Sequence, residues 1–369
     1  MTNAATFIDP TSGQSFPLDG SLWRAPNGNP LLVSDLAGIT RADIDSTCRS
    51  IWRYAKALPV PITKPISLGE GCTPLINFQS DGFELELKLE WFSPTGSFKD
   101  RGASVLMSFL NQQGIREVVE DSSGNAGAAI SAYGAAAGMD VTILVPAYTQ
   151  STKVGQSRAY GSKVVLIPGE REDTSAAAIE MAAQTFYASH NWHPMFLHGT
   201  KSLGYEIWED LGFNAPDNIV MPVSEGSSLL GCYIAFKELM RAGELERMPR
   251  LFAIQPENCA TLHHALSGTT QAQYLPTVAE GTAVKNPTRL QTMVEAVRNT
   301  NGGSVAISEQ EIIATSKGLA TAGIFTEPSS AQAYAGAKQL IREGQISRSD
   351  KTVVILTGTG LKSPSAYAE

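Results

Sequence analysis

The sequence predicts an α/β protein in which mostly parallel sheets are flanked by helices on both faces. Three observations lead to this fold class. Short apolar runs alternate with longer helix-like segments from about residue 118 onward. Clusters of Gly, Ser, Thr and Asn follow several of these runs, where strands would end. The composition, 43% hydrophobic and 17% charged, is globular, and 369 residues are long for one core, which favours two domains.

Charge and cysteine usage exclude several classes of partner. The net charge of −8, with no basic run, argues against nucleic acid or an anionic membrane. The 4 cysteines are isolated, which suits a reducing cytoplasm and gives no metal-ligand spacing. Met1–Ala5 lacks the basic and apolar regions of a signal peptide, and the longest uncharged stretch, near Ala126–Met139, is too short to span a bilayer. We expect a soluble, cytoplasmic protein.

Residues 1–92 contain few side chains that suggest a catalytic or binding site. Residues 1–65 read as an N-terminal extension in which Ile44–Leu58 is helical and Pro59–Pro65 ends the helix. The segment Leu68–Leu75 is rich in turn residues. In Phe83–Trp91, Leu and Trp alternate with Glu and Lys, which predicts a strand with one face in water.

Lys99 lies between a hydroxyl-rich turn and an apolar helical run. Ser97, with Asp100 three positions later, predicts a helix N-cap that places Lys99 in the first turn. The helix dipole and burial among neighbouring aromatic residues should both lower the pKa of its amine. A neutral lysine amine is a nucleophile that forms Schiff bases with carbonyl groups. The alternative is an ordinary surface lysine beside a turn.

Strand-like and helix-like segments then alternate to the end of the chain. Such alternation predicts mostly parallel sheets, in which ligands bind outside the carboxyl ends of the strands. Helices are expected after Gly127, at Ser175–Tyr187 and up to Met240. The expected strands are Val118–Val119, Val141–Val145, Val164–Ile167, Ile219–Val223, Leu251–Ile254, Ile324–Phe325 and Val353–Leu356.

Three of the predicted strand ends carry residues suited to small anionic or polar groups. Successive N–H groups and hydroxyls of Ser224–Ser228 would form an anion site for a phosphate, or merely a tightly packed connection. The loop Ser122–Gly127 suits the carboxylate of an amino acid, and Asn125 could bond a phenolic oxygen; its alternative is an N-cap with a glycine turn. Thr357 would be a neutral partner for a pyridine nitrogen, which favours elimination or replacement over transamination.

Three histidines close in sequence suggest a metal site at first sight. No carboxylate or cysteine joins His190, His193 and His198 at ligand spacing. We therefore expect no bound metal.

Five motifs, in this order, resemble those of the fold-type II pyridoxal-phosphate enzymes, and threonine synthase is the family they resemble most. The resemblance runs from about Trp52 to Leu361 and includes Ile51–Tyr54 with Leu58–Pro59 as a lead-in segment and Gly69–Leu75 as a Gly-Glu-Gly-x-Thr-Pro-Leu motif. The five motifs are Ser93–Gly102, Ser122–Gly127, Ser224–Ser228, Glu327–Ala331 and Thr357–Leu361.

The resemblance implies a tryptophan synthase β-like fold, with two open twisted, mostly parallel sheets flanked by helices. It implies pyridoxal 5'-phosphate as cofactor, Lys99 as the catalytic Schiff-base lysine, Asn125 near the ring oxygen and Thr357 at the ring nitrogen. The residues implied around the cofactor phosphate are Ser224, Glu225, Gly226, Ser227 and Ser228. The residues assigned to the amino-acid substrate are Thr95, Ser122, Ser123, Asn125 and Ala126.

The same resemblance sets the expected domains and assembly. Residues 66–105 and 201–369 would form a large cofactor-binding domain, and residues 106–200 a small mobile domain. The extension over residues 1–65 resembles a zinc-knuckle lead in which Ser12, Ala25 and Asn27 stand near the expected cysteines, so any such zinc is lost. We expect a homodimer.

Two departures from the family pattern concern anion binding. Phe196 stands where many threonine synthases have an arginine that holds the substrate phosphate. Glu225 places a carboxylate in the phosphate loop, which would weaken phosphate binding unless the carboxylate points away.

The reaction implied is that of a carbon–oxygen lyase acting on an activated amino acid. The leading candidate converts O-phosphohomoserine and water into threonine and phosphate. An alternative is β-elimination or β-replacement on O-phosphoserine or an O-acylserine, which Phe196 favours. A further alternative is a non-catalytic relative that has kept the fold, although Lys99 is present.

Overall fold

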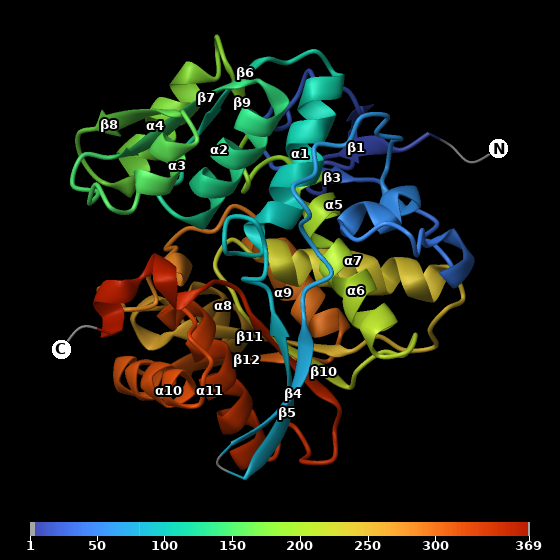
Figure 1. Ribbon diagram of the computed structural model, residues 1–369, viewed down its shortest axis with the longest axis vertical. Coiled ribbons are helices and arrows are strands. Elements are labelled where there is room, and N and C mark those ends of the chain that lie inside the picture. The colour runs from blue at the N-terminus through green and yellow to red at the C-terminus, as the bar shows by residue number, and fades with distance from the viewer. Residues whose placement is uncertain (1–3, 81, 368–369) are drawn as a thin grey trace. The chain divides into compact units, whose positions relative to one another are not determined.

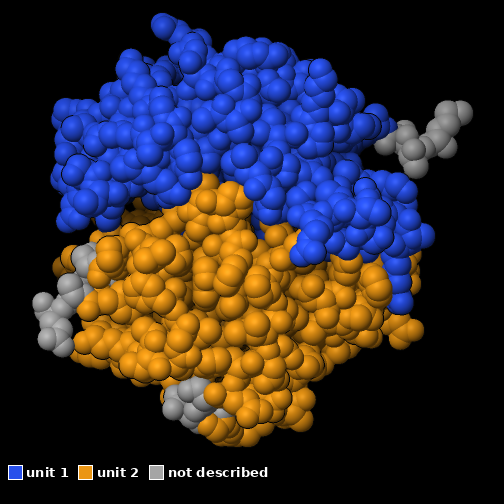
Figure 2. Space-filling model, viewed as in Figure 1, with its two compact units in different colours: residues 1–70, 99–200 blue, residues 71–98, 201–369 orange. Residues whose placement is uncertain are grey.

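The structure is a computed structural model that describes residues 4–80 and 82–367. It contains two compact units, coloured blue and orange in Figure 2. Unit 1 comprises residues 1–70 and 99–200, and unit 2 comprises residues 71–98 and 201–369. The predicted α/β class is confirmed in both (Figure 1).

The N-terminal part of unit 1 contains a small antiparallel sheet in the order β2-β1-β3. Its strands are β1 (Thr6–Ile8), β2 (Ser15–Pro17) and β3 (Leu32–Val33). Short 3-10 helices follow at Arg41–Asp43 and Ile51–Ala57. The helix predicted over Ile44–Leu58 is therefore too long, because the helical turns begin only after Ser50, whose hydroxyl accepts the Trp52 N–H.

A four-stranded parallel sheet in the order β8-β7-β6-β9 forms the centre of unit 1. The predicted helix over Ser175–Tyr187 is wrong at its end, because the helix stops at Met181 and Phe186–Tyr187 pairs with β6. The strands are β6 (Glu117–Glu120), β7 (Asp140–Pro146), β8 (Lys163–Ile167) and β9 (Phe186–Tyr187). The helices are α1 (Lys99–Gln112), α2 (Asn125–Ala137), α3 (Gly155–Ala159), α4 (Arg171–Met181) and α5 (Pro194–Thr200).

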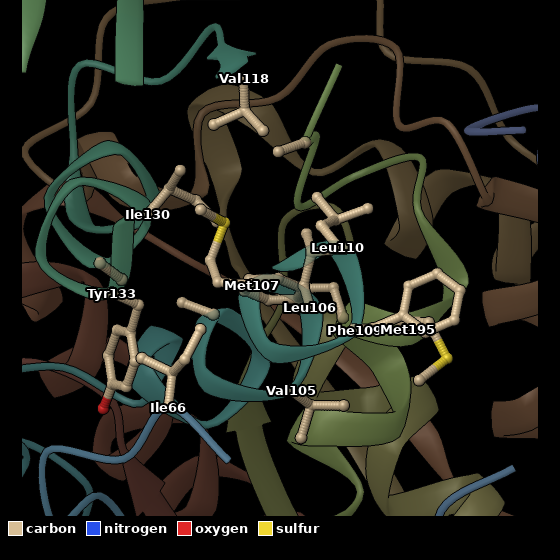
Figure 3. Packing of buried hydrophobic residues seen from close by; sticks show 14 of the residues in the cluster. Ile66, Val105, Leu106, Met107, Phe109, Leu110, Val118, Ile130, Tyr133 and Met195 are labelled. Atoms are coloured by element: carbon tan, nitrogen blue, oxygen red, sulfur yellow. The ribbon is translucent and has the colours of Figure 1, made fainter. Parts of the chain in front are cut away.

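The main core of unit 1 lies around α1. Figure 3 shows Leu106 and Met107 of α1 among Ile130 and Tyr133 of α2 and Val118 of β6. The whole of α1 from Asp100 to Leu110 is buried, so it is an interior helix rather than a surface one. This position fixes the start of α1, and with it the backbone of Lys99.

Unit 2 contains a six-stranded sheet in the order β12-β11-β10-β13-β5-β4. All neighbouring strands are parallel except β4 and β5, which form an antiparallel hairpin. The predicted strand Ile324–Phe325 is absent, because only Thr326 forms an isolated bridge, to Thr359. The strands are β4 (Leu75–Ser80), β5 (Phe83–Leu89), β10 (Asn218–Pro222), β11 (Arg250–Pro256), β12 (Gly303–Ile307) and β13 (Thr352–Leu356).

The helices of unit 2 cover this sheet, and α11 packs against its central strands. Their core, separate from that of unit 1, includes Leu87, Val220, Phe252, Tyr334 and Val354. Within residues 4–80 and 82–367, no helix is both long and apolar enough to cross a membrane. The helices are α6 (Ser202–Asp210), α7 (Ser227–Arg241), α8 (Thr261–Ser267), α9 (Leu290–Asn299), α10 (Glu309–Thr321) and α11 (Pro328–Arg342), with 3-10 turns at Glu257–Cys259, Glu280–Thr282, Gly360–Lys362 and Pro364–Tyr367.

Strand β5 departs from the predicted alternation. Lys88 and Glu90, expected in water, are fully buried. The Lys88 ammonium donates to Glu206 at 2.7 Å and to Asp210 at 2.6 Å, and Glu90 accepts the Thr73 hydroxyl at 2.6 Å. Buried charges are tolerated where they are paired in this way, so only the first half of the strand has a wet face.

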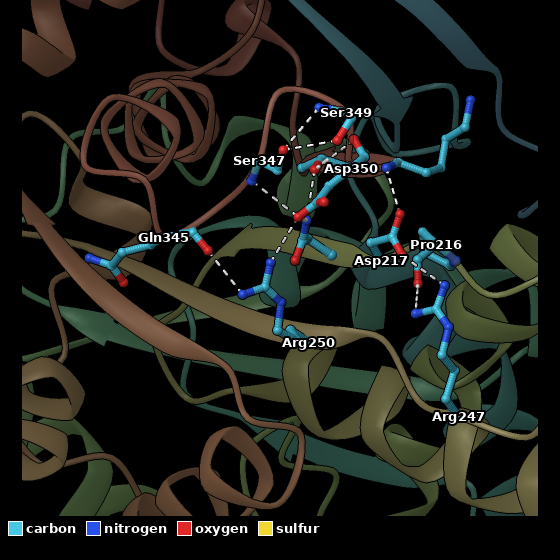
Figure 4. Close-up of polar contacts among 11 residues, drawn as sticks. Pro216, Asp217, Arg247, Arg250, Gln345, Ser347, Ser349 and Asp350 are labelled. Carbon is cyan, nitrogen blue, oxygen red and sulfur yellow. Dashed lines mark hydrogen bonds and ion pairs between the residues drawn. The ribbon is translucent and has the colours of Figure 1, made fainter.

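The amino-terminal ends of the unit 2 strands are closed by ion pairs (Figure 4). Arg250, at the start of β11, donates to Asp350 at 2.9 Å just before β13, and Arg247 donates to Asp217 at 2.7 Å just before β10. The carboxyl ends of β10 and β13 lead instead into loops rich in Gly, Ser and Thr. The carboxyl ends of these strands, with their polar loops, therefore form the side of the sheet available for ligand chemistry.

The units divide the chain differently from the predicted domains. We expected a separate extension over residues 1–65 and a small domain over residues 106–200. Both stretches belong to unit 1 in the structure, because Phe7, Leu31 and Trp52 pack in the same core as α1. The predicted mobility of residues 106–200 stays a prediction.

Candidate functional site

Lys99 is the first residue of α1, as expected, but the predicted N-cap is wrong. Ser97 forms an isolated bridge with Gly358, and its buried Oγ has no hydrogen-bond partner among the residues the structure describes. The ring of Phe196 lies under the lysine, with its centroid 5.7 Å from Lys99 Nζ. The ammonium thus lies above an aromatic face in unit 1.

Phe196 belongs to α5 and is fully buried. A Cβ added at Gly102 of α1 would lie 2.4 Å from its ring, and one added at Gly199 of α5 would lie 2.2 Å from the Arg101 carbonyl oxygen. The two glycines therefore permit the close approach of α1 and α5. The position where the resemblance led us to expect an arginine is here part of the lysine's apolar support.

The predicted carboxylate loop joins β6 to α2. Asn125 is the first residue of α2, and the Gly124 N–H donates to the Ser122 hydroxyl at 3.3 Å. A Cβ at Gly127 would lie 2.0 Å from the Ser122 carbonyl oxygen, so this turn admits only glycine. Ser122, Ser123 and Asn125 keep partial exposure while Ala126 is buried. The loop thus presents hydroxyls and the first amides of a helix, as a carboxylate site requires.

A buried pair beside this loop was not found from the sequence. His190 Nδ1 lies 2.6 Å from one Glu120 carboxylate oxygen, and the backbone N–H of His190 donates to the other oxygen at 3.3 Å. Burial raises the pKa of Glu120 and lowers the pKa of His190, so both side chains resist becoming charged. The positive charge of Lys99 acts on both groups. Glu120 follows an apolar pair in β6 and its partner is 70 positions away, so no local pattern marks it.

Another missed residue, Glu70, joins three parts of unit 1. Its fully buried carboxylate accepts the Trp52 indole N–H at 3.0 Å, the Ser104 hydroxyl at 2.7 Å and the Tyr133 hydroxyl at 2.7 Å. It thereby fixes α1 relative to α2. The sequence signal for this role of Glu70 was the Gly-Glu-Gly motif, because a glutamate between two glycines of a turn indicates a specific function of its side chain.

Thr357 lies in a turn that is held by the Glu-Pro-Ser-Ser motif. The Ser330 hydroxyl lies 2.8 Å from Thr357 Oγ1 and accepts the N–H groups of Thr357 and Gly358 at 3.0 and 2.9 Å. Ser330 was read only as part of a motif, and it is the anchor of Thr357. Phe98 N–H donates to the Thr357 carbonyl at 3.0 Å, which ties this turn to the residue preceding Lys99. A backbone hydrogen bond therefore joins the motif Ser93–Gly102 to the motif Thr357–Leu361.

The predicted phosphate loop connects β10 to α7. Gly226 has φ +81°, and a Cβ there would lie 2.1 Å from Met293 Sδ, so glycine is required. Ser227 and Ser228 are the first residues of α7 and are buried. The Glu225 carboxylate accepts the Thr288 N–H at 2.9 Å, before α9. The Glu225 carboxylate is thus bound by the segment that precedes α9.

The structure distributes the predicted residues between the units. Lys99, Ser122, Ser123, Asn125 and Ala126 lie in unit 1. Thr95, Ser224, Glu225, Gly226, Ser227, Ser228 and Thr357 lie in unit 2.

The residues present fit pyridoxal phosphate. A helix N-terminus preceded by an obligatory glycine suits the phosphate. The hydroxyl pair at Thr357 suits a ring nitrogen that receives no full charge. The Ser97 hydroxyl, two residues before Lys99, is buried and has no hydrogen-bond partner among the described residues, so it can bind a ligand.

Two of the three histidines contact other side chains. His190 bonds Glu120, and the His193 ring packs among Phe7, Phe109 and Phe186. No group of three His, Cys, Asp or Glu side chains in the described part of the chain could hold a metal ion.

Sequence comparison identifies relatives over most of the chain. Residues 66–358 match the family described as pyridoxal-phosphate dependent enzyme. A threonine synthase of Methanosarcina acetivorans is 35% identical over 340 residues, covering 88% of this chain and 83% of that protein. Threonine synthases of Methanocaldococcus jannaschii and Mycobacterium tuberculosis are each 32% identical, covering 86% and 84% of this chain and 81% and 88% of those proteins.

Solved structures share the fold at lower identity. O-ureido-L-serine synthase is 23% identical with a TM-score of 0.69, covering 83% of this chain and 94% of that one. Threonine deaminase isoform 2 of Solanum lycopersicum is also 23% identical with a TM-score of 0.69, covering 80% and 82%. The lysine motif, the ordered polar turns and the matches at over 30% identity agree. The chain belongs to the threonine synthase-like family of fold-type II pyridoxal-phosphate-dependent enzymes.

Proposed function

We propose that this enzyme converts O-phosphohomoserine and water into threonine and phosphate. The observation that carries the proposal is the 35% identity to a threonine synthase over 88% of the chain. The neutral hydroxyl pair of Thr357 and Ser330 supports an elimination or replacement reaction over transamination. In the net reaction, the substrate's Cγ–O bond breaks and phosphate leaves with the electron pair, while Cβ loses one proton and Cγ gains one. The oxygen of water bonds to Cβ as a hydroxyl, and the second proton of the water goes to the phosphate.

Residues of both units have assigned roles in this proposal. Lys99 would hold the cofactor, and its amine would then remove the substrate's Cα proton and return protons to the carbon chain. Pyridoxal phosphate, when bound, supplies a sink for the electron pair left at Cα. Asn125 would bond the ring oxygen, Thr357 the ring nitrogen, and the loop Ser224–Ser228 the phosphate.

The remaining assigned residues would orient the substrate. The hydroxyls of Ser122 and Ser123, the amide of Asn125 and the backbone of Ala126 would bind its carboxylate at the start of α2. Thr95 precedes Gly96, whose carbonyl accepts the Thr359 N–H at 3.1 Å, so its backbone is held by the Thr357 turn. Fixing the carboxylate orients the Cα–H bond relative to the base.

A second candidate is β-elimination or β-replacement on O-phosphoserine or an O-acylserine. Phe196 favours it, because a buried apolar ring packed against Gly102 stands at the position where an arginine for the substrate phosphate was expected. A shorter substrate would place its leaving group elsewhere.

One assay with two substrates separates the candidates. We expect the purified holoenzyme to release phosphate from O-phosphohomoserine and to form threonine in equal amount, detected by mass spectrometry. Lys99→Ala should lose both the activity and the visible absorbance band of the bound cofactor. Release from O-phosphoserine alone would select the second candidate. Activity that survives in Lys99→Ala would contradict the proposed role of the lysine.

A further inference from the structure

The carboxylate of Glu225 stands out in the phosphate loop because acidic groups oppose phosphate binding. Its contact is specific: Glu225 Oε2 accepts the Thr288 N–H at 2.9 Å. Thr288 and Arg289 immediately precede α9, and Arg289 is the N-cap residue of that helix. The positive end of the α9 dipole therefore lies beside the Glu225 carboxylate.

Arg289 is the cation next to this contact. It is 2% exposed, and the Arg289 carbonyl accepts the Met293 N–H at 3.0 Å in the first turn of α9. Met293 in turn packs on the loop, since its Sδ lies 2.1 Å from where a Gly226 Cβ would be. The segment 288–293 thus contacts two consecutive residues of the loop, Glu225 and Gly226.

The charges of the two side chains act on each other. Burial lowers the pKa of Arg289 to about 10, and the negative charge of Glu225 opposes that decrease. An arginine stays charged at this pKa near neutral pH, so the buried positive charge of Arg289 and the half-buried negative charge of Glu225 act on each other. Such groups are stable when they compensate each other and costly when one is removed.

We propose that Arg289 is a charge-compensating residue of the phosphate loop, neutralising Glu225 and thereby setting how strongly the loop binds the cofactor phosphate. The proposal rests on the assignment of Ser224–Ser228 to that phosphate. Without Arg289, the charge of Glu225 would act on the phosphate dianion. Without the negative charge of Glu225, the positive charge of Arg289 would remain and would attract the phosphate dianion. The two substitutions must therefore change phosphate binding in opposite directions.

The test compares pyridoxal phosphate with pyridoxal, which has the same aldehyde and no phosphate. Apoenzyme with Lys99 intact is titrated with each compound at one ionic strength, and the ratio of the two dissociation constants reports the phosphate contribution alone. We expect Arg289→Gln to lower the preference for the phosphate form about tenfold and Glu225→Gln to raise it by a similar factor. The double variant should return close to the wild-type ratio.

Two further variants serve as references. Arg247→Gln removes an arginine of the same unit, paired with Asp217 at the opposite edge of the sheet, and should leave the ratio unchanged. Gly226→Ala should lower the ratio by displacing the loop from Met293. Unchanged binding of pyridoxal in the charge variants shows that the fold is kept.

The outcomes distinguish the inference from the assignment on which it rests. A ratio that falls in Gly226→Ala but is the same in both charge variants keeps the loop as the phosphate site and overturns the role of Arg289. Shifts of both charge variants in one direction also overturn it. A wild-type ratio near one, unaffected by any variant, removes the loop assignment and the inference together.

Discussion

Asp9 organises the turn that contains Ser12 and Asn27, two of the positions near which the resemblance led us to expect the cysteines of a zinc knuckle. Its carboxylate accepts the Ser12 hydroxyl at 2.6 Å, the Asn27 amide at 2.8 Å and the Asn29 amide at 3.1 Å. Two of the three predicted substitutes for cysteine, Ser12 and Asn27, thus bind one carboxylate, while Ala25 is buried in the core. Hydrogen bonds to an ionised group join segments that a metal would otherwise join.

Replacing Asp9 by alanine should destabilise the N-terminal sheet in a pH-dependent way. The hydrogen bonds from Ser12 and then Asn27 lower the pKa of Asp9 below its ordinary 3.8. A carboxylate with a depressed pKa in the folded state stabilises the protein above its ordinary pKa, and this contribution is lost as the pH falls through the folded value. Thermal unfolding followed by circular dichroism should show Asp9→Ala melting below wild type at pH 7, with the difference shrinking at acidic pH.

Asp19 provides the matched control for this measurement. Its carboxylate accepts only local bonds from Ser21, two residues away, so Asp19→Ala should have a smaller effect. If Asp9→Ala and Asp19→Ala melt alike at pH 7, the carboxylate does not hold the turn together.

The sequence pointed to Ser12 and Asn27 in this turn but not to Asp9, the residue that binds them. Asp9 contacts Asn27 and Asn29 across 18 and 20 positions, and such pairing depends on the path of the intervening chain. The same limit applies to Glu120 and His190. By contrast, Lys99, Asn125 and Gly226 lie at helix starts, as expected, because turns and helix starts are encoded within a few residues.

Among the elements, α1 and α5 show the closest packing around the lysine. Gly102 and Gly199 permit it, and the Phe196 ring fills the space beside Gly102. Strands with a run of four apolar residues, such as β10 and β13, were predicted from their sequence. Strand β9 was missed because two residues carry no periodicity, and β12 because it begins with glycine and serine. The alternation in β5 misled because Lys88 is neutralised inside the fold.

Gly102→Ala should destabilise unit 1 and disturb the lysine. Its methyl group would lie 2.4 Å from the Phe196 ring, which is buried and has no room to move away. Overpacking of this kind costs about 1–3 kcal/mol. Denaturant unfolding should show this loss, and the absorbance spectrum of the bound cofactor should change because Lys99 Nζ lies over the same ring.

Gly155→Ala is the control for the same unit. No atom lies within 4 Å of a Cβ at Gly155, so its free energy of unfolding should stay within about 1 kcal/mol of wild type. Equal stability of the two variants would mean that α5 adjusts freely to the added methyl group.

For the whole molecule, the α/β class followed from the alternation of segments, but the division into units did not. The lead segment with Phe7 and Trp52 joins the core of α1, and residues 71–98 join the sheet of the other unit, so the chain passes between the units three times, after residues 70, 98 and 200. Contacts over such separations leave no local signal. Each unit nevertheless has its own apolar core, so local destabilisation should stay within one unit.

The buried Lys88 offers a test of that separation. In unit 2 the Lys88 ammonium pairs with Glu206 and Asp210, and these ion pairs join β5 to α6. It also donates to the Thr73 carbonyl at 2.7 Å. Lys88→Met would leave the Glu206 carboxylate buried without its cation, and breaking a buried pair costs about 3–5 kcal/mol. Hydrogen exchange should accelerate in β5 and β13 while α2 and β7 of unit 1 keep their protection.

The comparison that makes this prediction specific is Lys351→Met. Lys351 pairs with Glu86, a carboxylate of β5, at 3.0 Å, but the Lys351 side chain is 53% exposed. Exposed pairs contribute less than about 1 kcal/mol, so exchange in this variant should match the wild type. Each ion pair includes one residue of β5, so a difference between the two variants points to burial as the cause. Equal acceleration in α2 and β7 of Lys88→Met would instead mean that the two cores unfold as one.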